Sequence, residues 1–275
     1  KDFKNLKIIK EKNFDINDQM DVIAKKSINV FSKVIKKIKP DLFVLHGDRV
    51  ETLAASICCN FNNTLIAHIE GGEVSGTVDE SLRHATSKLS HIHFVSNKKA
   101  KKLLIRMGEA PKNIFIIGSP EVDIMINKKL PTLDECKKRY DIKFLRYSIF
   151  LYHPVTTMSK DEIVKQNKVL FSCLKKSKKN YVLIFPNNDT HSNLILKSIL
   201  QFKKNKFFKL LPSIRFEYYL TLLKNSDFII GNSSSGMREA PVYGVPSINL
   251  GNRQKNRIKS TTILNANYEK KSILK

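Results

Sequence analysis

Helical patterns alternate with short apolar runs along most of this 275-residue sequence. Apolar residues recur at helical spacing over 18–39, and the run Leu42–Leu45 that follows has the pattern of a buried strand. Repetition of this order predicts helices at 18–39, 51–60, 79–90 and 98–107, with strands at 42–45, 65–69, 93–96 and 114–117. Alternating strands and helices favour an α/β class with a parallel sheet.

A second α/β set begins after residue 147. We predict strands at 148–152, 181–185 and 228–230, and a helix at 160–177. The segment 128–146 is charged, contains a proline and resembles a linker. We therefore predict two Rossmann-like domains, 1–127 and 147–275, joined by the linker 128–146. Lys7–Ile9 could form a further strand, so that the first domain would lack its usual first strand-loop-helix unit.

The composition is that of a soluble globular protein, with 41% hydrophobic residues. No apolar run approaches the roughly 18 residues of a membrane span, and the first twelve residues are a charged mixture without a signal-peptide core. We expect a cytoplasmic protein. The four cysteines lack paired spacing, so reduced thiols are favoured over a disulfide or a zinc site.

A formal charge of +24 raises the hypothesis of a basic polyanion-binding protein. Lysine far outnumbers arginine, however, and it is spread over polar helix faces without interleaved aromatic residues that could stack on bases. A solvated surface is therefore the preferred interpretation, and we expect no nucleic-acid partner. The excess positive charge would still raise the encounter rate with a small anionic substrate.

Carboxylates gather where the first predicted strands end. Asp48 and Arg49 follow one strand, and Glu70 follows the next at the start of a glycine-rich acidic stretch. Asp79 and Arg83 lie about one turn apart at the start of a predicted helix. Asp48 and Asp79 could each be a helix cap. Carboxylates at one edge of a sheet can instead divide into acids and bases, because like charges and burial separate their pKa values.

A possible anion site lies in the second domain. Gly231–Glu239 joins a predicted strand to a predicted helix and is rich in glycine and serine. Such a turn allows backbone N–H groups and the positive end of a helix to approach a diphosphate. Glu239 could accept hydrogen bonds from ribose hydroxyls, Arg253 could neutralise a phosphate, and His153 could contact phosphate or sugar.

Together these motifs resemble the hydrolysing UDP-N-acetylglucosamine 2-epimerases of sialic-acid biosynthesis. The matching motifs are HGDR (46–49), HIEGGEVSGTVDE with RH (68–84), GSP (118–120), YHP (152–154), PNND (186–189), GNSSSGMREA (231–240) and GVPSINLGNRQ (244–254). The resemblance implies a GT-B-like fold with the active site in the interdomain cleft and no metal or other cofactor. It also implies conversion of UDP-GlcNAc and water into N-acetylmannosamine and UDP through a 2-acetamidoglucal.

The resemblance also assigns roles to individual residues. It implies Asp48, Glu70 and Asp79 as catalytic acids and bases. Substrate-binding candidates are Arg49, Arg83, His153, Asn187, Ser233, Ser234, Glu239 and Arg253. The family's partners are UDP-GlcNAc and UDP, and its members suggest a homodimer or homotetramer.

One family feature is not found in this sequence. The family begins with a strand and a GTR-type phosphate-binding loop, and no such motif precedes Lys7. We expect the 275-residue chain alone to be weakly active or inactive.

Other functions compete with this reading. The nearest is a hydrolysing 2-epimerase of a GDP-linked diacetamido sugar. The catalytic carboxylates act at C1 and C2, so they do not distinguish the nucleobase or the substituents at C4 and C6 of the sugar. A non-hydrolysing epimerase or a GT-B glycosyltransferase would share the fold. The product would distinguish the epimerases, because only the hydrolysing type releases free sugar.

Overall fold

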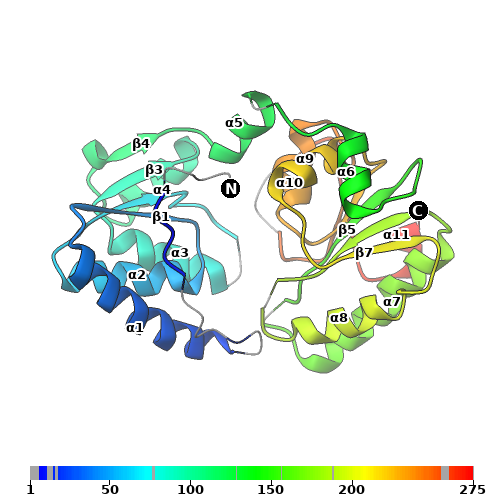
Figure 1. Cartoon of the computed structure of the whole chain (residues 1–275), viewed down its shortest axis with the longest axis horizontal. Coiled ribbons are helices and arrows are strands. Elements are labelled where there is room, and N and C mark those ends of the chain that lie inside the picture. The colour runs from blue at the N-terminus through cyan, green and yellow to red at the C-terminus, as the bar shows by residue number, and fades with distance from the viewer. Residues whose placement is uncertain are drawn as a thin grey trace. The chain divides into compact units, whose positions relative to one another are not determined.

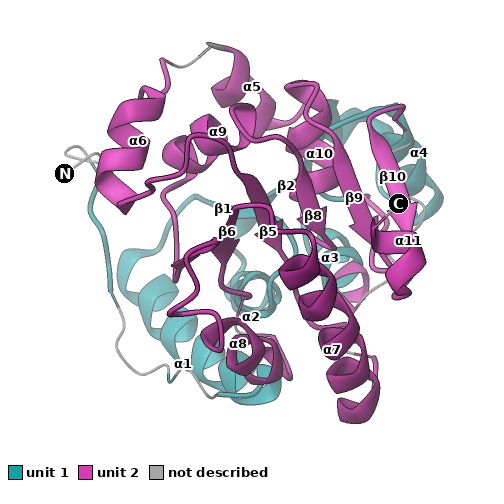
Figure 2. Cartoon of the chain, turned by 90° about the vertical axis from the view of Figure 1, so that its right-hand side faces the viewer, with its two compact units in different colours: residues 1–72, 82–115 teal, residues 73–81, 116–275 magenta. Residues whose placement is uncertain are grey.

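The computed structural model describes residues 6–10, 15, 18–75, 78–127, 129–155, 157–187, 189–254 and 260–274 (Figure 1). Its contacts form two compact units (Figure 2). Unit 1 comprises Lys1–Gly72 with Leu82–Phe115, and unit 2 comprises Glu73–Ser81 with Ile116–Lys275. The segment predicted as a linker belongs to unit 2, and the domain boundaries 1–127 and 147–275 stay a prediction.

Unit 1 is built on a sheet in the order β1-β2-β3-β4. The strands are β1 (Leu42–His46), β2 (Leu65–Ile69), β3 (Ile92–Val95) and β4 (Ile114–Ile116). The helices are α1 (Met20–Ile38), α2 (Val50–Phe61), α3 (Val78–Lys88) and α4 (Lys98–Arg106), with a 3-10 turn at Pro111–Asn113. The pairs β1–β2 and β2–β3 are parallel. Helix α3 is shared between the two units, because Val78–Ser81 belong to unit 2 and the rest of the helix belongs to unit 1.

The alternation of side chains along β1 explains how its sheet is covered. Leu45 is buried in a cluster with Ile66 of β2 and with residues of α1 and α2. Leu42 and Val44, on the opposite face of the strand, are 44% and 54% exposed. Among the described strands, β1 lies at one edge of its sheet. The core of unit 1 therefore lies on the side of the sheet that α1 and α2 cover.

Unit 2 contains a six-stranded parallel sheet in the order β10-β9-β8-β5-β6-β7. The strands are β5 (Ser148–Leu151), β6 (Tyr181–Ile184), β7 (Phe208–Leu211), β8 (Ile229–Gly231), β9 (Ser247–Leu250) and β10 (Ile263–Ala266). The helices are α5 (Pro120–Asn127), α6 (Leu133–Tyr140), α7 (Lys160–Lys176), α8 (Ser192–Leu200), α9 (Phe216–Lys224), α10 (Ser235–Val242) and α11 (Lys270–Leu274).

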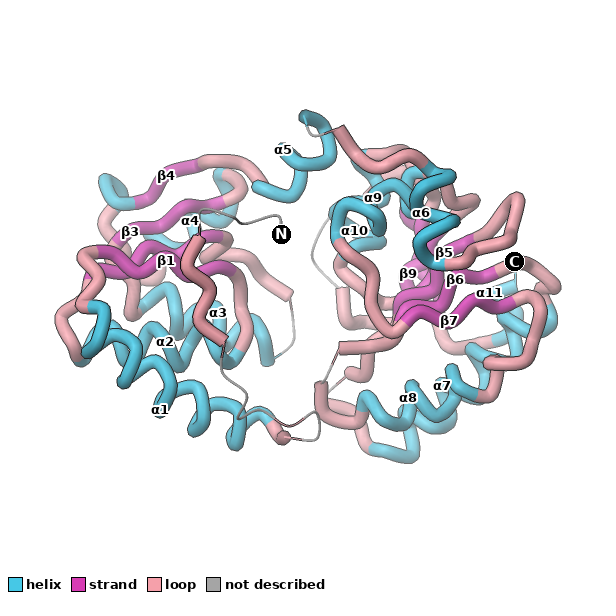
Figure 3. The backbone as a smooth tube through the Cα atoms, viewed as in Figure 1, coloured by secondary structure: helices cyan, strands magenta, loops and turns pink. Residues whose placement is uncertain are grey.

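Helices cover both faces of this sheet (Figure 3), and an apolar core forms on each face. Phe150 of β5 points into the core shared with α7, α8 and α11, whereas its neighbour Ile149 points into the core shared with α5, α6, α9 and α10. Because both faces are covered, the central strands are apolar at successive positions. This explains why short continuous apolar runs, such as the one at 148–151, predicted strands correctly.

The strand order of unit 2 creates a crevice at one place. Counted from β5, the order reads 3-2-1-4-5-6, which is the Rossmann arrangement with its switch point between the first and fourth strands. Here those strands are β5 and β8. The chain leaves β5 towards α7 on one face and leaves β8 towards α10 on the other. Ligands of such sheets bind beyond the carboxyl ends of these two strands.

Local side-chain bonds fix where several helices begin. Thr132 and Glu135 form a capping box at α6, and Ser159 and Glu162 form one at α7. The Asn97 side chain accepts hydrogen bonds from two backbone N–H groups at the start of α4. These polar pairs allow charged sequences such as that of α6 to start as helices.

The predicted fold class of two Rossmann-like α/β units is confirmed. The predicted strand at Lys7–Ile9 is wrong: residues 6–10 are irregular, and Ile8 and Ile9 are 61% and 50% exposed. All four cysteines are buried and free. Within the described residues, no helix has the length and apolar character needed to cross a membrane.

Candidate active site

Asp48 and Arg83 form an ion pair in unit 1. Asp48 lies two residues beyond the end of β1, and Arg83 comes from α3. The Arg83 side chain is only 4% exposed, while the Asp48 side chain is 26% exposed. A buried guanidinium without its partner would be strongly destabilising, so Asp48 both balances Arg83 and presents a carboxylate to solvent.

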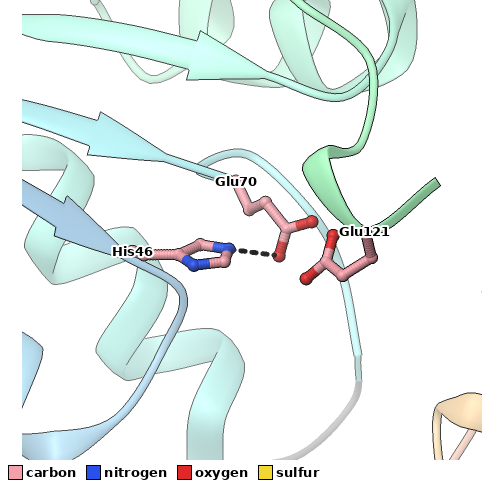
Figure 4. A group of neighbouring side chains, drawn as sticks. All are labelled: His46, Glu70 and Glu121. Carbon is pink, nitrogen blue, oxygen red and sulfur yellow. Dashed lines mark ion pairs between the residues drawn. The ribbon is translucent and has the colours of Figure 1, made fainter. Parts of the chain in front are cut away.

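Glu70 lies at the neighbouring strand end, since it directly follows β2. Its backbone φ is +66°, in a region that residues other than glycine rarely adopt, and its N–H donates to the Phe94 carbonyl at 2.8 Å. The Glu70 side chain is 8% exposed and its Oε2 lies 3.3 Å from His46 Nε2 (Figure 4). Unusual backbone geometry at a buried carboxylate is a feature of functional sites.

His68 connects the elements that carry Asp48 and Arg83. Its Nε2 lies 2.8 Å from the Gly47 carbonyl oxygen, and its Nδ1 lies 3.0 Å from Ser87 Oγ in α3. Burial lowers the pKa of His68 to about 4, so the ring is neutral at neutral pH. A neutral ring donates from Nε2 to the carbonyl and accepts at Nδ1 from the hydroxyl, which satisfies both nitrogens.

The buried state of His68 predicts a loss of stability in acid. An unfolded histidine has a pKa near 6.5, and the folded-state pKa is about 4. Between these values the unfolded chain binds a proton that the folded chain excludes, so this contribution is fully present above pH 6.5 and is lost as the pH falls towards 4. We expect the free energy of unfolding to fall by up to about 3 kcal/mol across this window. Urea titrations of the wild type and of His68→Gln should show the steeper pH dependence in the wild type, and equal slopes would contradict the assignment.

A pocket of about 390 Å³ lies in unit 2 at the switch point. It is lined by Leu151, His153, Ile184, Phe185, Pro186, Asn187, Pro212, Ser213, Ile214, Phe216, Tyr219, Ser233, Ser234 and Arg253. The volume falls within the range of small-molecule sites, roughly 300 to 1,000 Å³. The lining beside β6 and β7 is mainly apolar, whereas His153, the two serines and Arg253 make the other side polar. Such a pocket suits a ligand with an aromatic group at one end and anionic groups at the other.

His153 lies beyond the end of β5 and is 5% exposed. Its Nδ1 accepts a hydrogen bond from the Asn187 backbone N–H at 3.2 Å. In the neutral ring the proton is therefore on Nε2, which makes that nitrogen a donor. The Asn187 side chain itself is exposed at the rim of the pocket.

The turn after β8 brings two serines and the start of α10 to the pocket. Ser233 and Ser234 line the pocket, and α10 begins at the next residue. Gly236, in the first turn of α10, packs so closely that an added Cβ would lie 2.5 Å from Ser247 Oγ. The glycine therefore allows α10 to start against β9, and the positive end of the helix borders the pocket.

Glu239 is a buried carboxylate in α10. Burial raises its pKa, and the neighbouring Arg238 opposes that rise. Its Oε2 atom is buried and has no hydrogen-bond partner among the described residues. A buried acceptor of this kind is costly unless a donor reaches it. Glu239 is thus suited to receive a hydroxyl from a ligand.

Two further candidates carry charge in unit 2. Arg253 lines the pocket with a side chain that is 14% exposed, and its Nη2 lies 3.9 Å from Asp79 Oδ2. The structure thus gathers His153, Asn187, Ser233, Ser234 and Arg253 at one pocket. Glu239 is not among the residues that line it.

The remaining candidates belong to unit 1. Arg49 and Arg83 are not part of the unit 2 pocket, and the Arg49 side chain is 45% exposed with its Nε 4.0 Å from Glu51 Oε2. The sequence prediction did not select His46, His68 or Asn232. All three lie in the quoted motifs at strand ends, and that position was the available signal.

A parallel sheet in Rossmann order with a pocket at its switch point is typical of nucleotide-binding α/β proteins. Comparison with known proteins narrows this class. The family model described as UDP-N-acetylglucosamine 2-epimerase matches residues 3–275, and the chain belongs to this family. The family-level resemblance inferred from the motifs is confirmed.

Individual relatives agree with this assignment. The UDP-N-acetylglucosamine 2-epimerase of Neisseria meningitidis serogroup B is 46% identical over 257 residues, which cover 93% of this chain and 67% of that protein. The GDP/UDP-N,N'-diacetylbacillosamine 2-epimerase (hydrolyzing) of Campylobacter jejuni is 36% identical, with coverage of 87% and 64%. The chain spans about two thirds of the length of these relatives.

Solved structures agree on the fold. The crystal structure of Methanocaldococcus jannaschii UDP-GlcNAc 2-epimerase in complex with UDP-GlcNAc and UDP matches with a TM-score of 0.77 and 21% identity. The match covers 94% of this chain and 73% of that one. At this identity the likeness supports the fold.

Proposed function

We propose that this chain acts as a hydrolysing UDP-N-acetylglucosamine 2-epimerase, which converts UDP-GlcNAc and water into N-acetylmannosamine and UDP. The observation that carries the proposal is the switch-point pocket lined by His153, Ser233, Ser234 and Arg253. Its donors and cationic group suit a nucleoside diphosphate. Membership of the family supports UDP-GlcNAc as the nucleotide sugar.

The nucleotide-binding roles follow from the contacts in unit 2. Arg253 would neutralise charge on the diphosphate, the His153 Nε2–H would donate a hydrogen bond to it, and the positive end of α10 would stabilise it. This matters most when UDP departs with an added negative charge, because fixed donors stabilise charge that develops in a transition state. The buried Glu239 Oε2 would accept a ribose hydroxyl, which would satisfy an atom that lacks a partner among the described residues.

The proposed chemistry requires at least two proton transfers. A carboxylate removes the C2 proton while the C1–O bond breaks and its electrons leave with UDP, which gives a 2-acetamidoglucal. Water then adds at C1, and an acid returns a proton to C2 from the opposite face, so that C2 is inverted. Asp48, Glu70 and Asp79 are the proposed acids and bases, and positioned groups of this kind accelerate proton transfer by about 10²- to 10⁴-fold.

Incubation of the full-length protein with UDP-GlcNAc in heavy water tests this reaction. We expect UDP and N-acetylmannosamine in equal amounts, with deuterium at C2 of the free sugar, because the returned proton comes from solvent. NMR of the products measures both. Deuterium-free N-acetylmannosamine would exclude proton abstraction at C2, and a UDP-linked product would indicate the non-hydrolysing reaction.

The competing substrate is a nucleotide-linked diacetamido sugar. The relative named for UDP-GlcNAc is 46% identical to this chain and the relative named for diacetylbacillosamine is 36% identical, which favours UDP-GlcNAc. The ratio of kcat/KM for the two substrates decides between them. A cytoplasmic location and a homo-oligomeric state accompany the proposal as predictions, and light scattering measures the latter.

A further inference from the structure

Asn232 joins the two strands that flank the switch point. The pairing of β5 with β8 ends at Leu151 and Gly231. Asn232 follows directly, and its Oδ1 accepts a hydrogen bond from the His153 N–H at 2.7 Å. Its Nδ2 donates to the His153 carbonyl at 2.8 Å. The side-chain amide thus occupies the place of a further peptide group in the sheet.

The position of this amide has a physical reason. Beyond the switch point the backbone that follows β5 and the backbone that follows β8 leave towards opposite faces, so they can no longer pair. His153 is nevertheless 5% exposed, and Asn232 is fully buried. Buried peptide groups without partners are costly. Asn232 satisfies both groups of His153 where the ladder stops.

The backbone of Asn232 extends the connection to a third segment. Its carbonyl oxygen accepts from Arg253 Nη1 at 3.2 Å and from Gln254 Nε2 at 2.9 Å. Gln254 is 2% exposed, so this contact is also shielded from water. One buried residue therefore bonds the segment after β5 and the segment after β9, and it directly precedes Ser233.

We propose that Asn232 is a positioning residue that holds His153, Ser233 and Arg253 as one frame for the diphosphate of the bound nucleotide. These three residues line the pocket, whereas Asn232 does not. The inference rests on the proposed binding of UDP. The role of Asn232 is distinct from binding the base. The apolar part of the pocket belongs to the segments after β6 and β7, and none of its described residues is hydrogen-bonded to Asn232.

The test compares UDP with uridine, which lacks the diphosphate, on the 275-residue chain and on Asn232→Ala. We expect the variant to bind UDP about tenfold or more weakly, because charge-assisted hydrogen bonds depend on placement. The affinity for uridine should change by less than about threefold. Titration calorimetry measures both affinities, and circular dichroism establishes the folded state.

Asn249→Ala is the matched control. Asn249 is a buried asparagine of the same sheet, 5% exposed, whose Nδ2 donates to Asn265 Oδ1 at 2.8 Å and which does not line the pocket. It should leave both affinities unchanged. Should Asn232→Ala fail to fold, Asn232→Ser replaces it, since a hydroxyl reaches at most one of the two peptide groups of His153.

Three outcomes would overturn the inference. A folded Asn232 variant that binds UDP as the wild type does would remove the positioning role while leaving the proposed function intact. Equal losses for UDP and uridine, or failure of both variants to fold, would assign Asn232 to the stability of the sheet alone. A wild-type chain that binds no UDP would overturn both the inference and the proposed function.

Discussion

Replacement of Glu70 by glutamine is expected to lower kcat for UDP-GlcNAc by a factor of about 10² to 10⁴, because one general acid or base usually accelerates a reaction by that factor. Glutamine has the same shape, so the buried side chain, which is 8% exposed, can keep its packing beside His46. What is lost is the ability to exchange a proton. Steady-state kinetics of the full-length variant measure kcat, and calorimetry should show UDP affinity close to that of the wild type.

Glu109→Gln is the control for this substitution. Glu109 is also a carboxylate paired with a histidine in unit 1: its Oε2 lies 3.2 Å from His93 Nε2, and its side chain is 12% exposed. It follows the end of α4 and does not lie at the strand ends that carry Asp48 and Glu70. Its replacement should change kcat by less than about twofold. A Glu70→Gln enzyme with activity similar to that of Glu109→Gln would rule out Glu70 as an acid or base.

Replacement of Gly231 by alanine is expected to abolish the native packing of unit 2. An added Cβ would lie 1.9 Å from the Leu151 carbonyl oxygen, an atom of the neighbouring strand backbone. No side-chain rotation relieves that overlap, so β5 and β8 would have to separate. We expect the free energy of unfolding to fall by more than about 4 kcal/mol, which is a large part of that of a typical domain. Thermal unfolding followed by circular dichroism measures the loss.

Gly244→Ala separates steric overlap from backbone strain. Gly244 has a φ of +67°, and an added Cβ there would meet no heavy atom within 4 Å. Its replacement should cost only the strain of a left-handed conformation, about 1 kcal/mol. Similar destabilisation by the two substitutions would show that the close approach at Gly231 can relax.

The sequence predicted the central strands well and the polar helices less well. Runs such as Ser148–Leu151 are distinct because both faces of the unit 2 sheet exclude water. The sequence of α6, Leu133–Tyr140, is rich in charge and has little apolar periodicity, so it predicts a linker where the structure has a helix. Its start was nevertheless readable from Thr132 and Glu135, the two residues of a capping box.

The candidate site was predictable in its composition but not in its internal connections. Glu70 and Asp48 could be found because they follow apolar runs, and neighbouring parallel strands end at one edge. Asn232 could not be assigned a role in the same way, because its partner His153 is 79 positions away in the sequence. Which strands adjoin at a switch point is a property of the strand order, and local residue patterns do not encode that order.

The edge strand of unit 1 has a practical consequence for work with this chain. Among the described residues, no strand pairs with β1 on one of its sides, and its exposed Leu42 and Val44 add apolar surface beside the backbone groups there. Such an edge can recruit a strand from another molecule. Self-association measured for this chain therefore has two possible sources, a specific oligomer or pairing along β1. Lysine at position 44 should reduce only the second, so Val44→Lys belongs in any determination of its assembly state.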